Sequence, residues 1–422
     1  MTQWIQAQDV AGLVRPGMTV FVAGGTAEPR EILAALAEQG ECCAGVRFVA
    51  VSLPGINHVD FTNLDDQAQS TAFFATPENR DSIATGRTEF IPMQYSAIFD
   101  YLERDLPVDI ALVQLPKPAG DTISHGISVD FLPAVLDKAG LVVGEINSRQ
   151  PVPQGAPEML LSRLDYAVAC ERPVPTIVPP KIDSVISEIG RHIAGLINDG
   201  DCIQIGIGGI PGAAMAALSD RNDLGFHSGM ISDGAMNLAR AGNITGQMKA
   251  VDTHTMVSGA TLGSRELVDW AGNVPQLVFR PVGYTHNIDV LRRIENFVSI
   301  NAALEVDLFG QVNSDMLNGR QISATGGSID MMRGAALSSG GRSIVALKST
   351  ARAGEVSCIS PALSVRTATT ALRTDVDYVV TEYGARRIRH LPLKARAEAM
   401  IEIAHPDFRD RLHDEWHEMM LA

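Results

Sequence analysis

The sequence of 422 residues contains only five cysteines, and none of them belongs to a recognisable motif. They stand at positions 42, 43, 170, 202 and 358, without a Cys-X-X-Cys pair or a histidine-rich spacing. No metal site is expected, because structural zinc is held by closely spaced cysteines and histidines. An odd, scattered set of thiols is typical of a reducing compartment, which predicts a cytoplasmic protein without disulfide bonds.

Long apolar runs and basic clusters are lacking as well. No stretch of about 18 uninterrupted apolar residues occurs, so no transmembrane helix or membrane association is predicted. The N-terminus has no basic flank and no apolar core, which argues against a signal peptide. A formal net charge of −15 disfavours nucleic-acid binding, because phosphates attract clustered Lys and Arg. An anionic ligand is still compatible with this charge, since backbone N–H groups can hold one.

Glycine and small apolar residues are abundant instead. The chain has 38 glycines and is 45% hydrophobic, whereas aromatic residues make up only 5%. This composition is typical of an α/β enzyme with many turns between strands and helices. The length predicts two or three domains.

One pattern occurs twice, first in VAGLVRPGMTVFVAGGTAEP and later in IAGLINDGDCIQIGIGGIP. In each copy an apolar helix ends at a glycine turn, and a short strand follows, over 19–23 or 202–205. A glycine-rich loop then reaches Pro29 or Pro211, where helical sequence begins. Proline suits the first turn of a helix, where its missing N–H would have no partner. Each copy therefore predicts the strand–loop–helix unit that opens an α/β domain.

A proline-rich segment, ERPVPTIVPPKID, separates the two copies and predicts a linker. We expect one domain over 1–175 and a second over 182–422. Further buried strands are predicted in VRFVAVSL, DIALVQL, GLVVGEIN, FVSINAALEVDL, SIVALKST and VDYVVTEYG, and helices in DSVISEIGRHIAGLI and LKARAEAMIEIA. This alternation predicts two similar α/β domains with mostly parallel sheets and an active site in the cleft between them.

The loop GIGGIPGAA is the strongest local motif. Its glycines let backbone N–H groups approach a ligand, and the following helix adds partial positive charge at its N-terminus. Such a loop can hold a phosphate or an oxyanion, or it can be a turn that needs glycine only for packing. Two more glycine-rich stretches, 225–249 and 323–350, are candidate cleft walls, with ordinary connecting loops as the alternative.

Taken together, these motifs resemble the acetyl-CoA hydrolase/transferase family, most closely its 4-hydroxybutyrate CoA-transferase type. The resemblance spans nearly the whole chain and is carried by QIGIGGIP, LGFHSGMISDG, SINAALEVDLFGQVNSD, GGSIDMMRGAALSSGGRSI, DVDYVVTEYGARRI, IEIAHPDFR and, nearer the start, DIALVQLPKPAGDTISHG and GEINSRQPVPQG. It implies a homodimer or homotetramer that moves coenzyme A from an acyl-CoA to a short acid such as 4-hydroxybutyrate, acetate, itaconate or succinate. It also implies that a side-chain carboxylate attacks the thioester and then carries the CoA.

The resemblance further implies which residues contact CoA and stabilise oxyanions. The glycine-rich loop and two other glycine positions supply backbone groups, and three basic side chains are expected near the CoA phosphates. The full set is Gly206, Ile207, Gly208, Gly209, Ile210, Gly229, Met230, Gly326, Gly327, Arg333, Lys348 and Arg389.

The sequence departs from the family pattern at the residue that carries the chemistry. Family members usually have glutamate as the nucleophile at the third position of His227-Ser228-Gly229-Met230, where this chain has glycine. Asp60 is the preferred replacement and Glu28 the second, although Asp60 could also be a solvated loop carboxylate. The missing glutamate resembles an itaconate-type branch of the family, which lacks it too. The alternatives to a replacement nucleophile are direct transfer, thioester hydrolysis, and a protein that binds CoA esters without turnover.

Overall fold

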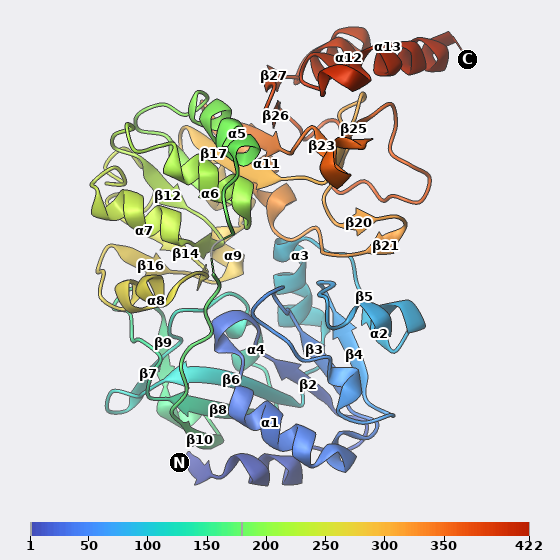
Figure 1. Cartoon of the computed structure of the whole chain (residues 1–422). Helices are drawn as coiled ribbons and strands as arrows, with labels where there is room; N and C mark the ends of the chain where they lie inside the picture. Colours follow the sequence, from blue (N-terminus) through green and yellow to red (C-terminus); the bar gives the residue numbers. More distant parts are fainter. Residues whose placement is uncertain (1, 179, 422) are drawn as a thin grey trace.

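Two eight-stranded sheets form the frame of the molecule, one in each half of the chain (Figure 1). The computed structural model describes residues 2–178 and 180–421. The first sheet runs in the order β1 (Gln3–Ile5), β10 (Tyr166–Cys170), β8 (Leu141–Asn147), β6 (Ile110–Pro116), β2 (Thr19–Val22), β3 (Arg47–Ala50), β4 (Gln69–Ala72) and β5 (Thr88–Phe90). All neighbouring strands in it are parallel.

The second sheet repeats this architecture. Its order is β16 (Leu277–Phe279), β14 (Met256–Ser258), β12 (Gly225–His227), β11 (Cys202–Ile205), β17 (Phe297–Ala302), β22 (Arg342–Ala346), β26 (Tyr378–Thr381) and β27 (Gly384–Arg387). All neighbours are parallel except β26 and β27, which form an antiparallel pair. The predicted α/β fold with two mostly parallel sheets is therefore confirmed.

Helices cover both sheets. In the first half of the chain they are α1 (Arg30–Glu38), α2 (Arg80–Thr85), α3 (Tyr95–Asp100) and α4 (Leu132–Leu136), with the short turns η1 (Ala7–Gly12), η2 (Gly25–Ala27), η3 (Gly40–Cys43), η4 (Phe61–Asn63), η5 (Tyr101–Asp105) and η6 (Leu161–Arg163). In the second half they are α5 (Ser184–Ala194), α6 (Gly209–Ala216), α7 (Asp233–Arg240), α8 (Arg265–Ala271), α9 (Val282–Thr285), α10 (Ile288–Leu291), α11 (Ser328–Leu337), η7 (Arg352–Gly354), α12 (Leu393–Glu402) and α13 (Pro406–Leu421).

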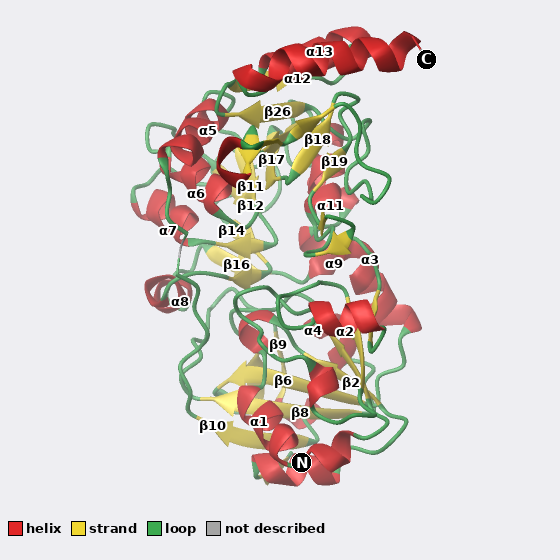
Figure 2. Cartoon of the chain, turned by 45° about the vertical axis from the view of Figure 1, so that its right-hand side comes forward, coloured by secondary structure: helices red, strands yellow, loops and turns green. Residues whose placement is uncertain are grey.

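In Figure 2, α5, α6 and α7 lie along one face of the second sheet and α11 along the other, while α12 and α13 lie at the end of the molecule farthest from the first sheet. Burial on both faces explains why β6 is buried along its whole length. Within the described residues, no helix combines the length and the apolar character that crossing a bilayer requires.

Short ladders complete the fold. They are β7 (Thr122–Ser124) with β9 (Glu158–Leu160), β13 (Met230–Ile231) with β15 (Ala260–Thr261), β18 (Glu305–Asp307) between β19 (Val312–Asn313) and β25 (Ile359–Ser360), β20 (Met316–Leu317) with β21 (Arg320–Gln321), and β23 (Thr350–Ala351) with β24 (Val356–Ser357). The prediction of one strand over 297–308 is wrong, because the chain breaks at 303–304 into β17 and β18.

The chain crosses between the two units through the predicted proline-rich linker. There the Ile177 N–H donates to the Gly263 carbonyl at 2.8 Å, so the linker lies against the second unit. Pro179 lies outside the described residues. The sheets take their strands from 3–170 and 202–387, while the domain bounds 1–175 and 182–422 stay predictions.

Both sheets have a topological switch point that positions the site. The chain leaves β2 toward β3 but leaves β6 toward β8 on the other side, and it leaves β11 and β17 in opposite directions in the same way. Such a reversal opens a crevice at the carboxyl ends of the strands, where ligands of parallel sheets bind. The loops after β2 and β11 both line cavities at these ends. The two crevices therefore open toward the interface between the units.

Backbone pairing joins the units at this interface. The segment 127–130 of the first unit pairs with 259–261 of the second, and the Val129 N–H donates to the Gly259 carbonyl at 2.9 Å. Nearby, Gln94 forms a bridge with Gly326. The Ser96 hydroxyl also donates to Asp330 Oδ1 at 2.6 Å. These bonds hold residues from distant parts of the chain in register around one cavity.

Candidate active site

A cavity of about 300 Å³ lies between the two units at the carboxyl ends of both sheets. Most of its lining is neutral, consisting of small, apolar and uncharged polar side chains. The first unit contributes Leu53, Phe74, Tyr95 and Asp130, and the second unit contributes the ends of β11 and β17 and the segment before α11. A cavity with convergent polar groups at this position is where a parallel α/β fold binds its ligand.

The glycine-rich loop between β11 and α6 forms one wall. The Gly206 N–H donates to the Ile300 carbonyl at 2.9 Å, which anchors the loop to β17. Gly208 has φ +120°, a conformation that residues with a side chain rarely adopt. No described residue accepts a hydrogen bond from the N–H of Ile207 or Gly208. These two groups at the start of α6 are suited to bind an oxyanion or a phosphate.

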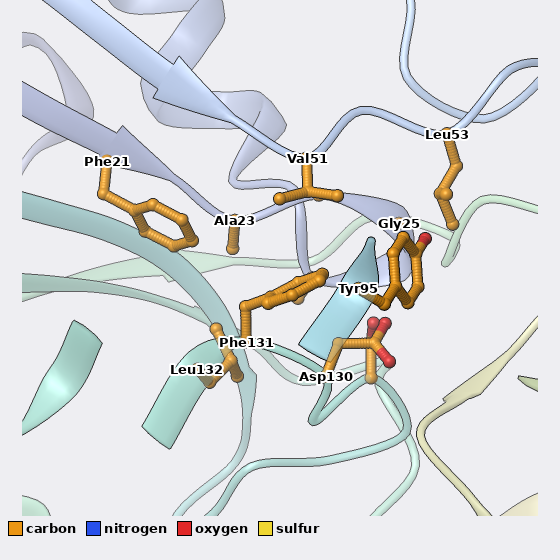
Figure 3. Close-up of a pocket in the computed structure, with 12 residues that line it drawn as sticks. Phe21, Ala23, Gly25, Val51, Leu53, Tyr95, Asp130, Phe131 and Leu132 are labelled. Carbon is orange, nitrogen blue, oxygen red and sulfur yellow. The ribbon is translucent and has the colours of Figure 1, made fainter. Parts of the chain in front are cut away.

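Asp130 supplies a carboxylate to the cavity. It is half-buried, and it also lines the adjoining recess beneath the loop after β2, where Figure 3 shows its carboxylate between Phe131 and Tyr95. Burial raises the pKa of Asp130 from its ordinary value to about 7, and a hydrogen bond with Ser128 offsets part of this rise. Among the described residues that line the cavity, Asp130 is the one carboxylate, and no lysine, arginine or cysteine lines it.

His286 lines the same cavity as a neutral imidazole. Burial lowers the pKa of His286 to about 3, because water no longer solvates the charged form. Its Nδ1 lies 2.9 Å from the Thr285 hydroxyl, and its ring packs 5.1 Å from that of Tyr95, centroid to centroid. Burial also raises the pKa of Tyr95 far above its usual range, so its phenol is protonated. Both side chains can therefore offer hydrogen bonds without bringing a charge.

Two glycines make room for the His286 ring. A Cβ atom added at Gly229 would lie 2.7 Å from Cε1 of this ring, and one added at Gly327 would lie 2.1 Å from its Nε2. Both distances are far below a van der Waals contact. The histidine therefore occupies the space beside residue 229 into which a longer side chain would point.

The cavity contains many of the predicted site residues but not all of them. Those that line it are Gly206, Ile207, Gly229, Met230, Gly326 and Gly327. Gly208 lines an adjoining cavity of about 110 Å³ on the other side of the glycine-rich loop. Gly209 and Ile210 are the first residues of α6, directly behind the loop. Contact of these residues with CoA stays a prediction.

The two predicted nucleophiles lie outside the cavity lining. Asp60 is half-buried and caps η4, where its Oδ1 accepts hydrogen bonds from the N–H and the hydroxyl of Thr62 at 3.0 and 2.8 Å. Glu28 is only 3% exposed and accepts a hydrogen bond from Arg30 at 2.9 Å. Burial raises the pKa of Glu28, and Arg30 partly offsets that rise. Local partners thus occupy both carboxylates, and the geometry does not favour either of them as the nucleophile.

The three basic residues predicted near the CoA phosphates do not line the main cavity. Arg333 Nη2 is 3.1 Å from Asp375, and Lys348 Nζ is 2.7 Å from Asp183. Arg389 is half-buried, and its N–H donates to the Asp377 carbonyl. A role for these residues in binding phosphate stays a prediction.

Sequence reasoning missed Asp130, Tyr95 and His286. None of them stands in a glycine-rich stretch or a recognisable catalytic motif, and they lie far apart along the chain. The sequence does place Asp130 four residues after a glycine, at the end of a run of residues that the structure buries, but nothing there indicates that it faces a second domain. A backbone φ of +26°, uncommon for any residue with a side chain, is the local structural sign that it is special.

Comparisons with known proteins match the chain along most of its length. The model of the acetyl-CoA hydrolase/transferase N-terminal domain matches residues 1–179, and that of the C-terminal domain matches residues 263–416. The chain is 36% identical to a 4-hydroxybutyrate coenzyme A transferase of Clostridium kluyveri, over 98% of this chain and 96% of that protein. It is 37% identical to a butyryl-CoA:acetate CoA-transferase of Anaerostipes caccae, over 79% and 77% of the two chains.

Solved structures are similar over the whole chain. RipA from Yersinia pestis is 29% identical, with a TM-score of 0.92 over 100% of this chain and 98% of that one. A 4-hydroxybutyrate CoA-transferase from Porphyromonas gingivalis is 32% identical, with a TM-score of 0.82 over 99% and 98%. These similarities extend over both units, and therefore over both sides of the cavity.

Proposed function

The chain belongs to the acetyl-CoA hydrolase/transferase family, and on that premise we propose that it transfers CoA from an acyl-CoA to a short monocarboxylic acid in the cavity between its two units. It is a CoA-transferase, with acyl-CoA as the co-substrate. A homodimer or homotetramer in the cytoplasm stays our expectation. The observation that carries the proposal is a cavity whose described lining has one half-buried carboxylate and neutral hydrogen-bond donors, beside a glycine-rich loop with two N–H groups that no described residue accepts from.

The lining of the cavity supports a preference among acids. A dicarboxylate such as succinate or itaconate would bring a second negative charge into the cavity, beside Asp130. Burying a charge without a partner is unfavourable, and the described lining offers no lysine or arginine to pair with it. Acetate or 4-hydroxybutyrate has only the carboxylate that reacts. A terminal hydroxyl could bond to neutral groups such as Gln204 or Asn301, which line the same cavity.

We therefore expect acetate and 4-hydroxybutyrate to accept CoA with a kcat/KM about tenfold or more above that of succinate and itaconate, because an unpaired charge disfavours binding. Mixing the protein with butyryl-CoA and each acid, and measuring the new CoA ester by mass spectrometry, tests this. As a matched variant, Leu304→Lys adds a cation to the cavity lining, where Leu304 is 36% exposed, and should narrow the gap. Equal use of succinate by the unaltered protein would contradict the proposal.

Thioester hydrolysis is the competing activity. Gly229 leaves the second unit without a carboxylate at the usual family position, and the neutral His286 could activate a water molecule as a general base. The same assay without an acceptor acid separates the two activities. Release of free CoA at a rate equal to that of exchange would favour hydrolysis, whereas exchange that depends on the acid favours transfer.

A further inference from the structure

Transfer of CoA between two acids requires a place to hold the CoA while the first acid leaves and the second arrives. A side-chain carboxylate suits this step, because its thioester with CoA has nearly the same energy as the acyl-CoA substrate, so neither half-reaction is strongly uphill. A serine hydroxyl could take only the acyl group as an ester and would release the CoA, so it could not hold CoA between the two acids. The described lining of the cavity contains no cysteine and one carboxylate, that of Asp130.

The backbone of Asp130 is held from the second unit on both sides. Its N–H donates to the Gly259 carbonyl at 3.4 Å, and its carbonyl accepts from the Val282 N–H at 2.9 Å. These contacts maintain the φ of +26°, a strained conformation that persists only where the surrounding structure holds it. Two backbone bonds to the second unit, one to Gly259 and one to the start of α9 (Val282–Thr285), fix the position from which the Asp130 side chain extends, and a nucleophile needs such a fixed position.

The Asp130 carboxylate lies close to the backbone of Gly229, and both residues line the cavity. A Cβ atom added at Gly259 would lie 2.5 Å from Asp130 Oδ1 and 2.7 Å from the Gly229 carbonyl oxygen, so the carboxylate and this carbonyl approach Gly259 from two sides. Glycine at 259 leaves room for the Asp130 carboxylate, because any side chain there would collide with it.

The surroundings of Asp130 keep it reactive. In the cavity lining, the described titratable groups that accompany it are Tyr95 from α3 and His286 from the segment after α9, both of them neutral. No cation is present in the described lining to neutralise its charge, and a hydrogen bond with Ser128 only partly offsets the rise of its pKa. An unpaired, partly desolvated carboxylate is more basic than one in water and therefore a stronger nucleophile toward a thioester.

We propose that Asp130 is the catalytic carboxylate that carries CoA in this enzyme, with the first unit supplying the group that Gly229 lacks; the proposal rests on CoA transfer as the function. An oxygen of Asp130 attacks the thioester carbonyl carbon, and the C–S bond breaks to give CoA thiolate and an acyl-aspartyl anhydride. The thiolate attacks the aspartyl carbonyl, releasing the first acid and leaving an Asp130–CoA thioester. The second acid reverses both steps, which regenerates the Asp130 carboxylate with no net proton exchange.

The pH dependence of the reaction follows from this role. Burial raises the pKa of Asp130 to about 7, and only the deprotonated form attacks. We therefore expect kcat to be constant above this pH and to fall about tenfold for each pH unit below it, as for a single essential base. Tyr95 and His286 keep one protonation state across this range, so they add no step. A profile that stays flat from pH 8 to pH 5 would contradict the assignment.

Covalent trapping tests the proposal directly. The protein is incubated with acetyl-CoA without an acceptor acid, reduced with borohydride, digested and mapped by mass spectrometry. A thioester on Asp130 should be reduced to homoserine at that position, and hydroxylamine should give a hydroxamate at the same residue. Asp130→Asn should carry neither mark, whereas Asp121→Asn, which alters an exposed carboxylate elsewhere in the first unit, should be marked at Asp130 as before.

The outcomes separate this proposal from the proposed function. A mark on Asp60, Glu28 or any other carboxylate, or exchange of CoA without a mark on any carboxylate, overturns Asp130 and leaves CoA transfer standing. A mark on Asp130 with release of CoA but no exchange into any acid supports Asp130 and overturns the transferase function. A protein with neither mark nor exchange overturns both.

Discussion

Replacing Asp130 with asparagine is expected to lower kcat for CoA exchange by about 1,000-fold or more, because the amide cannot form the anhydride. The side chain keeps its size, and the backbone bonds to Gly259 and Val282 do not involve it. KM should change little, since the loop after β11 and the rest of the lining are untouched. Steady-state kinetics with butyryl-CoA and acetate measure both constants.

Stability distinguishes this loss from unfolding. Burial raises the pKa of Asp130 in the folded state above its ordinary value near 3.8, so the folded protein binds this proton more tightly than the unfolded chain. The charged carboxylate therefore destabilises the fold above pH 7, and this effect disappears as pH falls from about 7 toward 4. Asparagine removes the charge, so the Tm of Asp130→Asn at pH 8 should equal or exceed that of the unaltered protein.

Two further results would decide the role of Asp130. Asp130→Glu keeps the carboxylate but moves it by one methylene, so partial activity is expected. If Asp130→Asn exchanged CoA at a rate within tenfold of that of the unaltered protein, another group would have to carry the CoA. A Tm that falls by many degrees together with the activity would indicate a structural role.

Replacing Gly327 with alanine is expected to destabilise the protein by about 1–3 kcal/mol, as overpacking of a closed site does. The added methyl group would lie 2.1 Å from Nε2 and 2.4 Å from Cδ2 of His286. The ring cannot easily move away, because Thr285 holds its Nδ1 and Tyr95 packs against it. We expect CoA exchange to fall with the stability, since the displaced ring would enter the cavity that it lines. Urea unfolding and the exchange assay measure the two effects.

A second change tests the cause of that loss. Removing the ring in Gly327→Ala/His286→Ala should restore much of the unfolding free energy relative to Gly327→Ala, because the two residues are coupled. Gly212→Ala is the control, since nothing lies within 4 Å of its added Cβ and it stands within α6. That variant should be as stable as the original or gain about 0.5–1 kcal/mol, as alanine favours a helix. Equal losses in both single variants would contradict a specific clash.

The fold could be predicted from the sequence because its signals are local. Buried runs such as those of β6 and β8, glycine turns before β2 and β11, and prolines near the starts of α1 and α6 are all visible within about twenty residues. The break between β17 and β18 was missed because Ala303 and Leu304 are apolar and continue the pattern of the strand. Their departure from the sheet places them in the cavity lining.

The candidate site could be predicted only in part. The glycines of the site were visible because glycine-rich turns leave a compositional pattern. The carboxylate was not, because the chemistry of an aspartate depends on its neighbours. Glu28 and Asp60 stand after buried strands, as catalytic carboxylates often do, but Arg30 and Thr62 hold them where they are.

The sequence by itself determined two α/β units, a glycine-rich loop at the opening of the second one, and the absence of a glutamate at position 229. The tertiary structure decided which carboxylate lies beside Gly229, the position where that glutamate is missing. Residues 127–130 pair with 259–261 of the other unit, and this pairing brings Asp130 beside Gly229. Such a contact joins segments more than 120 residues apart, so it depends on how the two sheets pack and leaves no local pattern in the chain.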